Sequence, residues 1–119
     1  MFRLAPVPTM RRTVTVRVPD PKIADKTTAH TFTALFRVLS REEAEAFDKS
    51  LREMTFEERG QHPLLRHVVK DWDGVEDESG NAIPFSEDAL ARALEFPWVA
   101  QAMMTEYSRG LAGEPRLGN

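Results

Sequence analysis

The chain has 119 residues, which is enough for one domain and too few for two. It contains no cysteine, which excludes disulfides, zinc–thiolate sites and thiol nucleophiles, and no stretch approaches the roughly 20 apolar residues of a membrane span. The net charge of −3 divides into +6 for residues 1–41 (8 bases, 2 acids) and −9 for residues 42–119 (8 bases, 17 acids). Such a split either steers association with a partner or another copy, or attracts the two parts within one fold.

Alternating apolar and polar residues predict two strands in the first third of the chain. TVTVRV (13–18) places three valines on one face and ends at PDPK, because proline cannot donate to a strand ladder. TTAHTFTALFRVLS (27–40) is the second strand, and we expect its more apolar face to meet the core. That face carries His30, Phe32, Ala34, Phe36 and Val38. The two strands are expected to pair antiparallel across a loop of about eight residues.

The next segment is predicted to be a helix with a well-defined start. In SREE the Ser40 hydroxyl can accept from the Glu43 amide while the Glu43 side chain reaches back, which is the pattern of a capping box. Apolar residues spaced 3, 4 and 3 apart then form a narrow stripe on an otherwise charged helix. The stripe consists of Ala44, Phe47, Leu51 and Met54.

After Gly60 interrupts this helix, the pattern changes every few residues. Pro63 is expected to open a short helix, and Val69 to Val75 to form a short extended segment that carries Trp72. The sequence DESGN that follows predicts a turn in which glycine takes a positive φ.

Two more helices complete the predicted elements. Ser86 is placed to cap the first, whose apolar stripe holds Ala89, Leu90, Ala93 and Leu94. Pro97 suits the first turn of the second, with Phe96 non-helical before it. One face of that last helix carries Val99, Met103, Tyr107 and Leu111, and glycines end it.

The order of these elements indicates an α+β fold, because the strands do not alternate with crossover helices. We expect a small antiparallel sheet, made of a hairpin plus a short extra strand, packed with three to five helices. The whole chain, residues 1–119, is expected to form a single domain. Its parts are an N-terminal extension or edge segment (1–11), the β-hairpin (12–38), a mostly helical part (40–112) and a flexible tail (113–119).

No pattern of catalytic or metal-binding residues is apparent in the sequence. The acids between Asp71 and Glu78 fail the EF-hand spacing in both registers that would use a glycine as the sixth residue. His62 and His67 are five residues apart, which is not the spacing of a helical zinc pair. No phosphate-binding loop, dinucleotide fingerprint or serine elbow is present. We therefore expect no enzymatic activity, no metal and no cofactor.

Nucleic acid and membranes are also not expected as partners. Arg11, Arg12 and Arg17 form a basic segment, but the chain has a pI of about 5.6 and no recognisable reader motif. The tryptophans Trp72 and Trp98 and the Met103–Met104 pair could serve a partner surface, although core packing is the more common role of such residues.

The order of motifs from Trp72 to Ser86 resembles the tail assembly chaperones of long-tailed (siphovirus-type) phages and prophages. The matching features are WDGV (72–75), the acidic turn with Gly80, and PFS (84–86) opening a helix with Leu90 four residues on. FTALFRVLSREE (32–43) is similar to the family's strand and its Ser-capped acidic helix. The resemblance spans roughly residues 27 to 112 and does not cover the N-terminal MFRLAPVPTMRR.

The resemblance implies a non-enzymatic assembly factor that binds the tape measure protein and assists polymerisation of the tail tube protein. It also implies a location in the bacterial host cytoplasm and absence from the mature virion. The alternative is another phage structural component, such as a tail-completion or head–tail connector protein. A homo-oligomer is a further expectation, since the +6 and −9 segments could dock head to tail.

A protein that covers the apolar faces of helices needs apolar surface with a charged rim. Candidate surfaces are the Phe32/Phe36 face of the sheet and the Val99/Met103/Tyr107 face of the last helix. The full set of candidate partner-binding residues is Phe32, Phe36, Trp72, Phe85, Trp98, Val99, Met103 and Tyr107.

Overall fold

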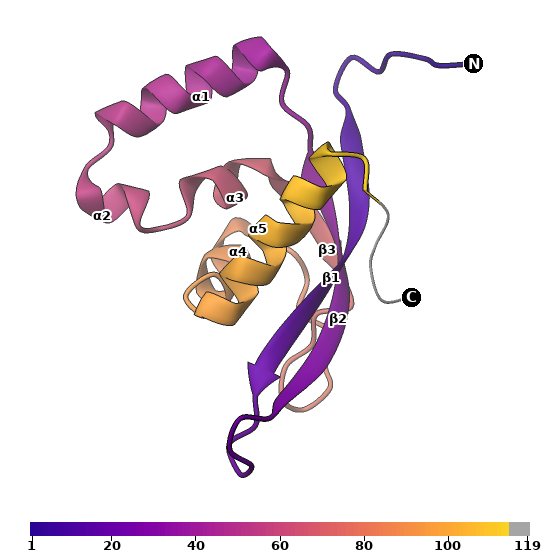
Figure 1. Cartoon of the computed structure of the whole chain (residues 1–119), viewed down its shortest axis with the longest axis vertical. Helices are drawn as coiled ribbons and strands as arrows, with labels where there is room; N and C mark the ends of the chain where they lie inside the picture. Colours follow the sequence, from indigo (N-terminus) through magenta and orange to yellow (C-terminus); the bar gives the residue numbers. More distant parts are fainter. Residues whose placement is uncertain (115–119) are drawn as a thin grey trace.

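A computed structural model describes residues 1 to 114 of the chain (Figure 1). Within that part, three antiparallel strands form one sheet in the order β1-β2-β3, and five helices lie to one side of it in this view. The α+β prediction is therefore confirmed. The strands are β1 (Thr9–Pro19), β2 (Thr27–Arg37) and β3 (Val69–Asp73). The helices are α1 (Arg41–Glu53), α2 (Phe56–Arg59), α3 (Pro63–Val68), α4 (Glu87–Ala93) and α5 (Pro97–Leu111).

The β1–β2 hairpin is longer than the valine alternation alone predicts. Its register runs from Thr9 opposite Arg37 to Pro19 opposite Thr27, so β1 begins four residues before the predicted Thr13. The extra residues pair because Met10 continues the inward face of the valines and lies opposite Phe36. In the segment expected as an N-terminal extension or edge (1–11), residues 1–8 precede β1 and residues 9–11 form the start of the strand.

The predicted short extra strand is present as β3, which pairs with β2 and ends at Asp73, two residues before the expected Val75. Ala34 pairs with Trp72, and a bulge lies between Leu35 and Phe36. The inward face of β2 meets the core: Ala34 and Phe36 are fully buried, and Phe32 is partly buried against them. The prediction for the apolar face of this strand is confirmed at these three residues.

Helix α5 covers the inward face of the sheet and packs most closely on β1. Met103 and Tyr107 are buried against the strands, and the Tyr107 ring lies 5.4 Å from that of Phe36. The last turn approaches so closely that a Cβ on Gly110 would clash with the side chain of Met10. A larger residue at this point of contact would have to displace the flexible end of the Met10 side chain.

Local sequence signals explain where the helices begin. Ser40 forms the predicted capping box with Glu43, Ser86 caps α4, and proline occupies the first turn of both α3 and α5. Helix α2 was not predicted, although Thr55 and Glu58 form a second capping box by the same rule. Four residues are too few to show an apolar period, so the sequence pattern does not indicate this helix.

Beyond Gly113, which ends α5 with φ +74°, the predicted flexible tail falls mainly on residues 115–119, outside the described part. No helix among residues 1–114 is both long enough and apolar enough to cross a bilayer.

Candidate functional site

Helix α1 extends away from the rest of the molecule (Figure 1). None of its residues is fully buried, and its apolar stripe of Ala44, Phe47, Leu51 and Met54 is only half-buried. With α2 it forms a projecting unit, residues 41–59, which we call the arm. A strongly amphipathic helix whose apolar side is incompletely covered is characteristic of a surface that binds another polypeptide.

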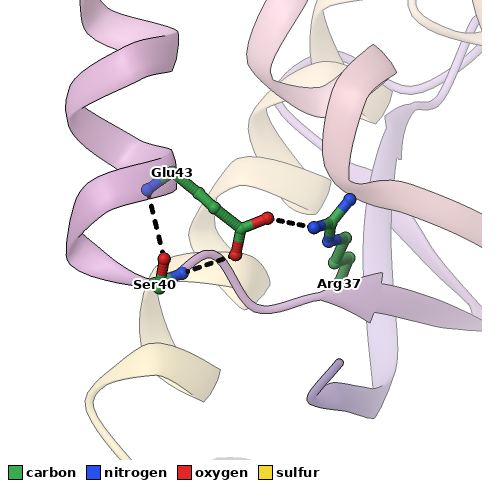
Figure 2. Close-up of polar contacts among 3 residues, drawn as sticks. All are labelled: Arg37, Ser40 and Glu43. Atoms are coloured by element: carbon green, nitrogen blue, oxygen red, sulfur yellow. Dashed lines mark hydrogen bonds and ion pairs between the residues drawn. The ribbon is translucent and has the colours of Figure 1, made fainter. Parts of the chain in front are cut away.

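The base of the arm is held by Glu43, as Figure 2 shows. The backbone N–H of Ser40 donates to the Glu43 carboxylate, and the Ser40 hydroxyl accepts from the Glu43 amide, both at 3.1 Å. The other carboxylate oxygen accepts from the guanidinium of Arg37 at the end of β2. The Ser40 N–H lowers the pKa of Glu43, and Arg37 adds to this effect, so the carboxylate is ionised where it both caps α1 and ties it to the sheet.

A ring stack joins the middle of the arm to the body. Phe47 of α1 lies over His67 of α3, with centroids 5.0 Å apart and planes at 15°. Burial lowers the pKa of His67, and the positive charges of Lys70 and Arg37 lower it further, whereas Glu43 opposes them. The fold therefore favours the neutral form of the imidazole at the contact between the arm and the body.

An open groove of about 1210 Å³ lies between the arm and the body, and we call it the arm groove. One side is formed by Leu51 and Arg52 of α1 and Arg59 of α2. The other sides are formed by residues of α3, of the α4–α5 junction and of one face of α5. These residues are His62, Pro63, Leu64, Leu65, Leu94, Glu95, Pro97, Ala100, Gln101, Met104, Thr105, Ser108 and Arg109.

The floor of the arm groove is apolar. Leu65, Leu94 and Ala100 lie at its bottom and are at most 5% exposed, and Met104 offers an accessible apolar side chain at 37%. Along α5 the lining residues recur every three or four positions, so one whole face of the helix borders the groove. Pro97 to Arg109 spans twelve steps of 1.5 Å, or about 18 Å.

The charged residues of the arm groove are mainly basic. Arg52, Arg59 and Arg109 line it, with Glu95 as the one carboxylate among its lining residues. Arg109 lies 3.9 Å from Glu106, whereas Arg52 and Arg59 form no ion pair with any residue of the described part.

The structure divides the eight candidate partner-binding residues into two groups, and none of the eight lines the arm groove. Phe36, Trp72, Met103 and Tyr107 are buried in the core, whereas Phe32, Phe85, Trp98 and Val99 are half-buried. Their role in partner binding stays a prediction.

Two aromatic clusters contain four of the eight predicted residues. Phe32 and Phe85 both meet the Trp72 ring edge-on, at 6.3 and 5.3 Å, and the Trp72 indole donates to the Ile83 carbonyl at 2.8 Å. This cluster pins the acidic turn to the sheet. Trp98 stacks on Phe96 at 5.7 Å near the start of α5, where Phe96 is 51% exposed.

Sequence reasoning missed most of the groove because it is assembled from four helices. One feature of the sequence does indicate an apolar surface on α5. Met104 follows Met103, so an apolar residue lies on a second face of the helix, beside the face that packs into the core. Leu51 was recognised as part of an apolar stripe, but its partial exposure becomes visible only in three dimensions.

The acidic stretch that follows Trp72 is a structural turn. The Asp77 carboxylate accepts from the backbone N–H groups of Ser79 and Asn81, both at 2.9 Å, and Gly80 adopts φ +83° as predicted. Within residues 1–114, no three or more His, Asp or Glu residues gather in a way that could hold a metal ion.

One arginine of the basic N-terminal segment, Arg12, forms an ion pair inside the fold. The Arg12 Nε donates to Oε1 of Glu106 at 2.9 Å, and this glutamate is only 4% exposed. Arg12 thereby ties β1 to α5.

These features define a small α+β protein that carries an open, mainly apolar groove between its arm and its body. Comparison with known proteins supplies its family. A protein-family model described as YdaY prophage protein matches residues 24–108, which is 85 of the 119 residues. The chain belongs to this family of prophage proteins. The matched region includes the arm and the whole groove up to Ser108, and it excludes β1. Neither the curated proteins nor the solved structures contain a match.

Proposed function

We propose that this protein is a tail assembly chaperone of a prophage. It binds the helical tape measure protein, assists polymerisation of the tail tube protein around it, and catalyses no reaction. It acts in the cytoplasm of the bacterial host and is absent from the finished particle. Membership of a prophage family and the order of motifs from Trp72 to Ser86 support this proposal.

The observation that carries the proposal is the arm groove. Its length of about 18 Å corresponds to about twelve residues, or three turns, of a bound helix. Its apolar lining presents Met104 on α5 and the half-buried Leu51 on the arm to the apolar face of such a helix, above the buried Leu65, Leu94 and Ala100. Laying an amphipathic helix into an apolar groove is an established mode of recognition between polypeptides.

The loose attachment of the arm suits a chaperone. Because α1 buries no residue completely, the arm can shift by small amounts without disrupting the core. A groove with one adjustable side can accept successive helices of different width along a long partner. Release into the growing tail requires moderate affinity, which an open groove of this size provides more readily than an enclosed pocket.

Co-expression tests the proposal. A fragment of the tape measure protein encoded by the same prophage should stay in the soluble fraction when the wild-type chain is present. Met104→Glu places a charge on the groove floor and should abolish this protection. Leu111→Glu is the matched control, because Leu111 is exposed on the same helix and lies outside the groove.

Equal solubility of the fragment with and without the chain would contradict the proposal. A chain that is retained in purified virions, detected by mass spectrometry, would instead favour a structural component such as a tail-completion or head–tail connector protein.

A further inference from the structure

We propose that the arm groove selects amphipathic helices whose apolar stripe is bordered by acidic residues. This inference rests on the proposed function, because it names the chemical character of the helix that the groove receives. It concerns the charges at the rim, whereas the proposed function depends only on the apolar floor.

The distribution of charge over the helical part supports the inference. Residues 42–114 contain seven Lys or Arg and seventeen Asp or Glu, so acids outnumber bases by more than two to one. Three of the seven bases line the arm groove, but only one of the seventeen acids does. The groove is therefore a basic surface on an otherwise acidic part of the protein, and it attracts acidic segments.

The three arginines border the groove from different elements. Arg52 and Arg59 come from the arm, and Arg109 comes from the last turn of α5. Because Arg52 and Arg59 have no ion-pair partner in the described part of the chain, their guanidinium groups are available to carboxylates of a bound helix. A helix seated on the apolar floor would bring its flanking side chains to these positions.

The charge also argues against the N-terminal segment of a second copy as the occupant. That segment has apolar side chains for the groove, since Phe2, Leu4 and Val7 are at least 56% exposed. However, it carries Arg3, which would place a positive group beside a basic rim. The mainly apolar floor in turn favours a helix over a polyanion such as nucleic acid, which would need a basic surface throughout.

Fluorescence anisotropy with three labelled peptides tests the inference. Each peptide is a helix of about 15 residues with the same leucine stripe, and the residues bordering that stripe are Glu, Gln or Lys. The wild-type chain should bind the Glu peptide about tenfold more tightly than the Lys peptide at about 0.05 M salt. The Gln peptide should lie between them, and the difference should shrink at about 1 M salt, where charges are screened within about 3 Å.

Charge reversal provides the matched variants. Arg52→Glu combined with Arg59→Glu should reverse the order of the Glu and Lys peptides. Arg17→Glu changes the same type of charge at an exposed position of β1, outside the groove, and should leave the order unchanged. Circular dichroism establishes that each variant is folded, and the peptide series on the wild-type chain gives an answer even if the double variant does not fold.

The outcomes separate this inference from the proposed function. Equal binding of the three peptides would overturn the charge preference and leave helix binding intact. Binding of none of them, with the tape measure fragment still kept soluble, would overturn the groove as the contact and leave the chaperone role intact. Failure in both experiments would overturn both proposals.

Discussion

Phe47 and His67 stack with their ring centroids 5.0 Å apart, and this contact joins the middle of α1 to α3. This contact helps to fix the position of α1, because no residue of α1 is fully buried. The position of the arm, and with it the width of the groove, therefore depends on this stack and on the Arg37–Glu43 ion pair at the base of the helix. Small changes at either contact should alter the arm without unfolding the sheet.

The first prediction concerns pH. The pKa of His67 in the fold lies below its ordinary value of 6.5, so the fold favours the neutral ring. The stabilisation of the arm is then fully present above about pH 6.5 and is lost as the pH falls through the lowered pKa. Hydrogen exchange in α1, corrected for intrinsic rates, should be faster at about pH 5.5 than at about pH 7.5.

His67→Phe is the control for this prediction, because it keeps an aromatic ring for the stack and removes the titration. The chosen pH range lies above the ordinary value of 4.5 for Glu43, whose pKa is lowered further, so the base of the arm stays ionised throughout. An unchanged pH response in His67→Phe would show that another group is responsible.

The second prediction concerns the buried ion pair between Arg12 and Glu106, which are 94 residues apart in sequence. Glu106→Ala leaves the Arg12 guanidinium, whose side chain is 17% exposed, without its main partner. Removing one member of such a pair should lower the free energy of unfolding by about 3 kcal/mol, measured by urea denaturation. Glu78→Ala, in an exposed turn, should change it by less than about 0.5 kcal/mol.

The double variant Arg12→Met/Glu106→Met distinguishes charge burial from packing. Because apolar replacement of both partners removes the unpaired charge, it should be clearly more stable than Glu106→Ala. If Glu106→Ala alone proved neutral, β1 would not be tied to α5 in the way the structure describes. That result would also weaken the assignment of β1, which the family match does not include, to the folded core.

The third prediction concerns the contact of α5 with β1. Gly110→Ala should change the free energy of unfolding by less than about 1 kcal/mol, because the greater helix propensity of alanine is offset by the shift that its Cβ imposes on the flexible end of the Met10 side chain. In a Met10→Ala background, where the Met10 side chain no longer has to shift, Gly110→Ala should raise the free energy of unfolding by about 1 kcal/mol. Thermal unfolding of the variants measures the effect, and an equal gain from Gly110→Ala with and without Met10→Ala would contradict the close approach.

The elements of this fold could be predicted from sequence where their signals are local. The Ser40 and Ser86 caps, the prolines at the start of α3 and α5, and the valine alternation of β1 each act within a few residues. They depend on hydrogen bonds and backbone geometry that neighbouring residues determine, so no knowledge of the tertiary structure is needed.

The groove could not be predicted in the same way. The stripe containing Leu51 looks the same in sequence whether the helix is fully packed or projects from the body. Similarly, Met103 and Met104 are adjacent, yet the first is fully buried and the second faces the groove. Which apolar residues remain accessible depends on how the helices pack, and that depends on contacts between residues far apart in sequence, such as Arg12 with Glu106.

The difference between local signals and tertiary packing also explains why the candidate partner-binding residues could not be placed from sequence. Large aromatic side chains are enriched both at interfaces and in cores, so Phe36 and Trp72 could not be assigned from residue type alone. The structure uses them in the core, where Trp72 also anchors the turn through its bond to Ile83. The proposed binding surface instead consists of smaller apolar residues framed by arginines.

Hydrogen exchange on the complex with the tape measure protein tests the central claim most directly. We predict that the partner slows exchange in the arm and in α3 and α5, whose residues line the groove, while the outer edge of β1 is unchanged. Protection confined to β1 and β2, or no protection anywhere in a chain that still keeps the partner soluble, would contradict the account.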